Sequence, residues 1–271
     1  MNRKTDAIVP DIETPDGIPL YYLDEGPRTT SGIFLLHAEP FNSSLWKKNI
    51  PELARQFRVV AMDVRGRGES GKTDAGHSLG QYARDFRHML EALGLEPVVA
   101  VGWLLGGSII WSYLQQFGED RLAGVVDVDQ PPYQFVSEAQ LETRLMAKRT
   151  NRLQQHLDAV ASYFGPEAER DEAVVRWMAY ECMKTPTAVH LPVVSESYHA
   201  DFRPLLSKVR VPTRIFWARY GSIKPEMAEF MRKGMPNAEL VFFEHSGHLI
   251  PWVEAEIFNR ELAAFAQGIL G

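Results

Sequence analysis

The chain of 271 residues contains a single cysteine, Cys182, so no disulfide can form within it. It also lacks a basic excess, because 29 lysines and arginines stand against 35 aspartates and glutamates. A net charge of −6 argues against nucleic acid as a partner. No apolar run approaches the length of a membrane span, and the N-terminus has no apolar signal segment. These absences predict a cytoplasmic protein that binds neither nucleic acid nor membrane.

Hydrophobic residues make up 45% of the chain, enough for one large core. Runs typical of buried strands are Ala7–Val9, Ile18–Leu23, Ile33–Leu36, Phe57–Met62, Val98–Val101, Val125–Asp129, Thr213–Trp217 and Leu240–Phe243. Helical periodicity lies between them, most clearly at Gln81–Leu93 and Ile257–Ile269. This alternation predicts an α/β protein with a doubly wound, mostly parallel sheet and right-handed crossovers.

Residues 133–200 differ from the rest of the chain. They are charged, show helical periodicity and contain no obvious strand. We interpret them as a helical lid inserted over the carboxyl edge of the sheet. The core then consists of residues 1–132 and 201–271.

The stretch from Val98 to Trp111 has the layout of a nucleophile elbow, which is a buried strand, a tight glycine turn and an apolar helix. The elbow pattern is G-x-S-x-G. Here the five residues 102–106 are Gly-Trp-Leu-Leu-Gly, so Leu104 takes the place of the serine. The sequence therefore predicts the framework for a nucleophile without the nucleophile.

Three further motifs follow in order. His37-Ala38-Glu39-Pro40 comes after one predicted strand, DVRGRGES at 63–70 after the next, and Ser-Gly-His at 246–248 after the last. With the elbow, these motifs resemble the α/β-hydrolase superfamily, in its haloperoxidase- and esterase-like branch. The resemblance covers the chain from about Ile18 to the last helix and implies an α/β-hydrolase fold.

The resemblance places the catalytic histidine at His248 and shows three altered positions. Leu104 replaces the nucleophile. The loop G-x-x-D-x-x-x-P, which carries the acid, has Gly221 in the acid position. The oxyanion motif H-G-x-P has Glu39 beside the place where negative charge would develop. Because leucine has no atom that can attack a carbonyl, and because neither Ser108 nor Ser222 lies on the elbow, we expect no ordinary ester hydrolysis.

His248 needs an orienting carboxylate, and Asp129 ends the strand after the elbow helix. The superfamily includes cofactor-independent dioxygenases, which take their acid from that strand end. The alternative is that Asp129 only bonds backbone amides in a turn before Pro131. Glu39 is open in the same way, as a second acid–base group, a cation-binding residue or a solvated loop residue. The predicted catalytic residues are His248, Asp129 and Glu39.

An apolar, aromatic pocket is predicted where loops converge at the sheet's carboxyl edge. The predicted substrate-binding residues are His37, Ala38, Phe41, Trp103, Leu104, Leu105, Trp217, Arg219 and Trp252. Arg219 and Lys224 are candidates to pair with Glu39 or with a substrate carboxylate, or are surface charges. No metal-ligand spacing is present, and we expect no metal or cofactor.

The leading hypothesis is a non-hydrolytic enzyme that moves protons next to a carbonyl, as in epimerisation, isomerisation or elimination. Its substrate would be a small molecule or a peptide, such as an intermediate of natural-product biosynthesis. The layout is similar to the bottromycin epimerases, which are α/β-hydrolase-fold proteins without the nucleophile serine. One alternative is a cofactor-independent oxygenase that uses His248 and Asp129. The other is a catalytically silent protein that binds a small molecule.

Overall fold

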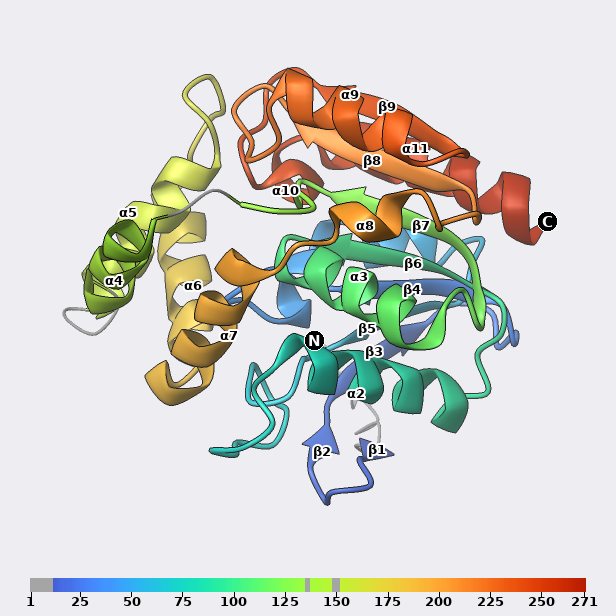
Figure 1. Ribbon diagram of the computed structural model, residues 1–271, viewed down its shortest axis with the longest axis horizontal. Coiled ribbons are helices and arrows are strands. Elements are labelled where there is room, and N and C mark those ends of the chain that lie inside the picture. Colours follow the sequence, from blue (N-terminus) through green and yellow to red (C-terminus); the bar gives the residue numbers. More distant parts are fainter. Residues whose placement is uncertain (1–11, 135–136, 148–151) are drawn as a thin grey trace, which may run out of the picture.

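The computed structural model describes residues 12–134, 137–147 and 152–271. Its centre is a seven-stranded sheet in the order β3-β5-β4-β6-β7-β8-β9. The strands are β3 (Tyr22–Glu25), β4 (Gly32–Leu36), β5 (Val59–Met62), β6 (Val98–Trp103), β7 (Leu122–Val128), β8 (Thr213–Ala218) and β9 (Ala238–Phe243). Edge strand β3 pairs antiparallel with β5, and every other pair is parallel. The predicted α/β-hydrolase architecture is confirmed (Figure 1).

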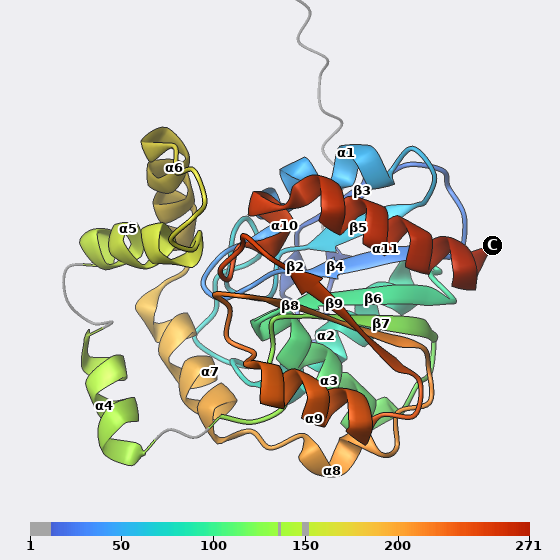
Figure 2. The same cartoon turned by 90° about the horizontal axis from the view of Figure 1, so that it is seen from above.

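Helices cover both faces of the sheet, which is why the central strands are apolar along their whole length. Every residue of β4, β5 and β6 is buried. On one face lie α2 (Leu79–Ala92), α3 (Leu105–Phe117), α8 (Arg203–Leu206) and α9 (Pro225–Gly234). On the other lie η1 (Ser43–Lys48), α1 (Ile50–Leu53), α10 (Ile250–Val253) and α11 (Ala255–Leu270), as Figure 2 shows. Among the described helices, none is long and apolar enough to cross a bilayer.

Four helices form a layer beside the core, within the region predicted as a lid (Figure 1). They are α4 (Glu138–Ala147), α5 (Arg152–Tyr163), α6 (Glu172–Met183) and α7 (Thr187–His199). Hydrogen bonds tie this layer to the core loops: Thr185 Oγ1 donates to the carbonyl of Pro40 over 2.9 Å, and Asn42 Nδ2 to Glu181 over 2.8 Å. These four helices, for which we keep the name lid, are therefore joined directly to the loop that contains Glu39.

The N-terminal strands differ from their prediction. The run Ile18–Leu23 is divided into β2 (Pro19–Leu20), which pairs with β1 (Ile12–Glu13), and the edge strand β3. The break falls at Tyr21, whose N–H donates to Ser70 Oγ over 2.9 Å instead of to a neighbouring strand. The predicted strand Ala7–Val9 lies outside the described residues.

Candidate active site

The elbow is a sharp turn between β6 and α3. Leu104 stands at its bend with φ 48° and ψ −107°, a conformation that is strained for a residue with a side chain. The turn closes because of its glycines. A Cβ on Gly102 would lie 2.5 Å from the backbone of Gly106, and one on Gly106 would lie 2.2 Å from the carbonyl oxygen of Leu36. The backbone thus presents the Leu104 side chain at the point where the elbow pattern has serine.

His248 lies in the loop between β9 and α10, and its Nδ1 is 2.6 Å from Oδ2 of Asp129. Asp129 follows β7 and is completely buried. Its carboxylate also accepts hydrogen bonds from the N–H groups of Ser222, at 2.8 Å, and Ile223, at 3.1 Å. The amides that Asp129 binds therefore belong to the loop after β8 and not to a turn before Pro131, and the same carboxylate meets His248. Since the carboxylate is the acceptor, Nδ1 of His248 carries the proton and Nε2 is left to exchange one.

Gly221 makes room for this carboxylate. A Cβ at Gly221 would lie 2.4 Å from Oδ1 of Asp129. A side chain at 221 and the carboxylate of Asp129 cannot occupy this space together. The glycine in the family's acid position therefore makes space for the aspartate at the end of β7. In the sequence these two residues look like separate differences from the family pattern.

His248 opens into a cavity of about 190 Å³ between the core and the lid. Glu39, Leu104 and Leu105 line it from the core, and His190 lines it from α7. Tyr163 of α5 packs edge-on against the His248 ring, with 5.1 Å between ring centroids. Burial raises the pKa of Tyr163 to about 12, so its hydroxyl stays protonated. The cavity is small and suited to one reacting group.

A second, wider hollow of about 750 Å³ adjoins this cavity. His248, Ser222, Tyr198 and Gln134 line both spaces. The two hollows together can accept a molecule whose reacting end is small and whose remainder is larger.

Ser222 lies close to His248 but at the wrong nitrogen for a nucleophile. Its Oγ is 3.1 Å from Nδ1, the atom that donates to Asp129. A protonated Nδ1 has no lone pair with which to remove the hydroxyl proton. Ser108 lines the cavity too, and no hydrogen bond joins it to His248 among the described residues. Neither hydroxyl is placed as an activated nucleophile.

Glu39 is largely buried in the site and is not a solvated loop residue. It also does not pair with Arg219 or Lys224, which were the other partners considered from sequence. It accepts hydrogen bonds from Arg67 Nε at 2.6 Å and from His190 Nδ1 at 2.5 Å. Burial by itself would raise the pKa of Glu39, but Arg67 and His190 outweigh it and lower the pKa to about 2. Glu39 is consequently a permanent carboxylate and not a base. No motif surrounds His190, so no local pattern indicates that it lines the site.

Several predicted substrate-binding residues lie behind the cavity wall. Trp103 is buried and donates from Nε1 to the carbonyl of His248 over 2.8 Å, and Phe41 stacks on it. His37 and Ala38 are also fully buried. Both ring nitrogens of His37 are engaged, with the carbonyl of Ala38 and with the N–H of Val64, and burial lowers its pKa. These four residues support the site and do not line it.

The other predicted residues lie farther out. Trp217 packs on Phe242 of β9, with centroids 4.5 Å apart. Arg219 forms an ion pair with Glu244 on the surface, which corrects the expectation that it faces the pocket. Trp252 lines a separate groove. Arg219 lies outside the cavity because the loop after β8 turns it outward. Trp252 lies outside it because α10 places this side chain against η1.

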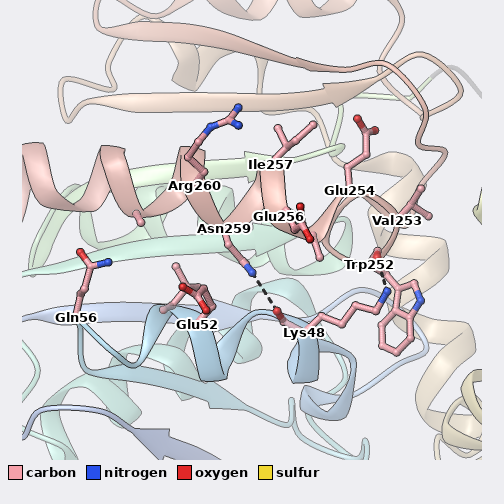
Figure 3. A pocket seen from close by; sticks show the side chains of 13 residues that line it. Lys48, Glu52, Gln56, Trp252, Val253, Glu254, Glu256, Ile257, Asn259 and Arg260 are labelled. Atoms are coloured by element: carbon pink, nitrogen blue, oxygen red, sulfur yellow. Dashed lines mark hydrogen bonds between the residues drawn. The ribbon is translucent and has the colours of Figure 1, made fainter.

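That groove is a hollow of about 900 Å³ and runs between η1, α1 and α11 (Figure 3). Asn259 bridges its floor by donating to the carbonyl of Lys48 over 3.0 Å. Its lining includes no histidine, serine, threonine or cysteine. We therefore place the active site at the smaller cavity. Among the described residues, no group of three or more histidine, cysteine, aspartate or glutamate side chains is arranged to hold a metal ion.

Comparison with known families decides the assignment of the chain. The family model for the alpha/beta hydrolase fold matches residues 33–255. The chain belongs to the α/β-hydrolase family. A bifunctional esterase/perhydrolase of Acinetobacter calcoaceticus is 30% identical over 94% of this chain and 98% of its own length. A non-heme haloperoxidase of Rhodococcus erythropolis is 28% identical over 96% of this chain and all of its own.

Solved structures show the same fold. The bromoperoxidase from Bacillus anthracis superposes with a TM-score of 0.86 at 24% identity, covering 93% of this α/β-hydrolase and 96% of that chain. An esterase from Exiguobacterium antarcticum also gives 0.86, at 22% identity, over 95% and 99% of the two chains. At these identities the likeness concerns the fold alone. The haloperoxidase- and esterase-like branch is supported by the two sequence relatives.

Proposed function

We propose that this α/β-hydrolase moves a proton at a carbon next to a carbonyl group and forms no acyl-enzyme. The observation that supports the proposal is the His248–Asp129 pair opening into a cavity beside Leu104. An ester hydrolase of this family needs an oxygen at the elbow, and leucine offers only hydrocarbon there. A histidine oriented by a buried carboxylate remains a competent general base without that oxygen.

A backbone amide can also stabilise the negative charge that develops on the substrate. Removing a proton beside a carbonyl gives an enolate, whose oxygen needs hydrogen-bond donors. Leu105 is the first residue of α3, so its N–H has no carbonyl partner within the helix and lies at the positive end of the helix dipole. This amide is the donor that we assign to the enolate oxygen.

Reactions that fit are epimerisation, isomerisation and elimination on a small molecule or a peptide. The similarity to bottromycin epimerases belongs to this proposal, since it depends on the replaced serine. The relatives named for esterase and haloperoxidase activity support the family and not this finer assignment. What separates this chain from the hydrolase pattern is Leu104 together with the exchange between Gly221 and Asp129.

A carbon acid with a visible proton tests the proposal. We would incubate the N-acetylcysteamine thioester of 2-phenylpropanoic acid in D₂O and follow its α-proton by NMR. The protein should accelerate exchange, and His248→Ala should lose the exchange of the enantiomer that His248 deprotonates by about 10²-fold or more. Ordinary hydrolysis of p-nitrophenyl acetate should be absent. Labelling of the unmodified protein by a fluorophosphonate, dependent on His248, would contradict the proposal.

A matched variant shows whether the site is otherwise complete. Leu104→Ser should gain fluorophosphonate labelling, because the new hydroxyl would stand at the elbow within reach of the His248 side of the cavity. Labelling should then disappear in Leu104→Ser with His248→Ala. If Leu104→Ser folds but is not labelled, residue 104 and His248 are not close enough for the histidine to activate a hydroxyl at the elbow.

Cofactor-independent oxygenation is a second candidate, favoured by the origin of the acid at the end of β7. There the same carbanion would be attacked by dioxygen. Oxygen consumption with a carbon-acid substrate separates this reaction from proton transfer, which consumes none.

A further inference from the structure

A second histidine–carboxylate pair lines the cavity that His248 lines. His190 of α7 donates from Nδ1 to Oε1 of Glu39 over 2.5 Å, just as His248 donates from Nδ1 to Asp129 over 2.6 Å. One pair is contributed by the lid and the loop after β4, and the other by the loops after β7 and β9 of the core. Both imidazoles line the cavity of about 190 Å³. They therefore approach a bound molecule from two different elements.

The carboxylate of the second pair is fixed as firmly as that of the first. Arg67 is completely buried and binds Glu39 through Nε over 2.6 Å. Its Nη1 donates to the carbonyl of Arg65 and to the hydroxyl of Tyr82, each over 2.8 Å. Glu39 cannot turn away from His190 without abandoning a buried guanidinium. It therefore acts as a positioning residue for His190.

We propose that His190 is a second catalytic acid–base residue, and that the enzyme inverts a carbon centre with two bases. This inference rests on the proposed function and adds the second proton donor to it. A single base returns the proton to the face from which it came. Inversion needs a donor on the other face, and His190 is the group that the lid supplies.

The step balances with two protons and no further reactant. Nε2 of His248 takes the α-proton, and the electron pair of the C–H bond moves into the carbonyl to give an enolate. Nε2 of His190, protonated at the start, gives its proton to the same carbon from the lid side. The product carries the inverted centre, His248 ends protonated and His190 ends neutral, so the reverse reaction starts from that state. Exchange with solvent resets the pair.

The two enantiomers of the thioester used above distinguish one base from two. In D₂O, two bases predict that each product enantiomer carries deuterium at its α-carbon while the remaining substrate keeps protium at early times. His190→Gln should reduce inversion by about 10²-fold or more. It should leave His248-dependent exchange of one enantiomer without inversion. His248→Gln should leave exchange of the other enantiomer.

The controls separate catalysis from folding. His199→Gln changes an exposed histidine on the same helix and should leave all rates unchanged. Glu39→Gln should lower kcat for inversion with little change in KM, and each variant's melting temperature reports whether it is folded. Inversion that survives His190→Gln would overturn the second base and leave the proposed function intact. Exchange absent for both enantiomers in the unmodified protein would overturn both.

Discussion

The elbow and the acid loop both depart from the hydrolase pattern, and they do so in opposite ways. At the elbow the strained backbone is kept, with φ 48° at Leu104, while the reactive side chain is gone. At the acid loop the side-chain chemistry is kept, because a carboxylate still meets His248, while its origin has moved to the end of β7. A histidine–carboxylate pair can therefore be assembled at this site without a nucleophile at the elbow.

The largest expected effect is on the retained dyad. Asp129→Asn should lower the rate of α-proton exchange by about 10³-fold, because an amide no longer favours the protonated imidazole or the correct tautomer. The measurement is the exchange rate by NMR, with Leu104→Ala as the comparison at the elbow. If Leu104→Ala proved the more damaging substitution, the dyad would not be the centre of the chemistry.

The acid loop can be returned to the family arrangement in two steps. Gly221→Asp alone should lower the free energy of unfolding by about 3–5 kcal/mol, because it forces a second carboxylate into the space of a buried one. Adding Asp129→Gly should recover most of this loss and part of the exchange activity. Urea unfolding of the single and double variants measures the coupling. Additive effects would contradict the shared space inferred from the 2.4 Å approach.

The stability of the elbow should depend on the absence of side chains at its glycines. Gly102→Ala should cost about 1–3 kcal/mol of unfolding free energy, since its Cβ would meet the Gly106 backbone at 2.5 Å. Gly268→Ala on α11 is the matched control, because a Cβ there meets nothing within 4 Å. It should stabilise by about 0.5–1 kcal/mol through helix propensity. Equal responses of the two variants would remove the argument for a tight elbow.

The carboxylate of Glu39 gives a smaller, pH-dependent effect. Its pKa is lowered from 4.5 to about 2, so its contribution to stability is full above about pH 4.5 and is lost as the pH falls toward 2. Glu39→Gln should cost about 1.5–3 kcal/mol at pH 7 from the lost charge-assisted hydrogen bonds. The difference from the unmodified protein should shrink between pH 4.5 and 2. A difference that does not depend on pH in urea unfolding would count against the Glu39–Arg67–His190 network.

Much of the fold follows from local signals in the chain. The apolar strands and the glycines of the elbow are short-range patterns, and α2, predicted at Gln81–Leu93, forms at Leu79–Ala92. The break at Tyr21 was missed because it depends on Ser70, which is 49 residues away. The site divides in the same way. His248 follows from its motif, whereas the contact of Glu39 with His190 joins residues 151 apart and has no local pattern.

Predictions made from residue type alone were wrong where tertiary packing decides whether a side chain faces the cavity. Aromatic and basic residues near the strand ends suggested a pocket, but Trp103 supports the His248 loop from behind and Arg219 pairs with Glu244 at the surface. The direction in which a loop side chain points depends on tertiary packing, which a single sequence does not specify. Gly221 shows the same dependence on tertiary packing. The reason that it has no side chain is the carboxylate of Asp129, which is 92 residues away in the sequence and occupies the space.

The close approach of residues 221 and 129 also limits which neighbouring sequences can fold into a working site. A change from one acid position to the other needs two substitutions, because a single one leaves either two crowded acids or none. The two positions are therefore best exchanged together, and a library that varies only one of them would contain few active members.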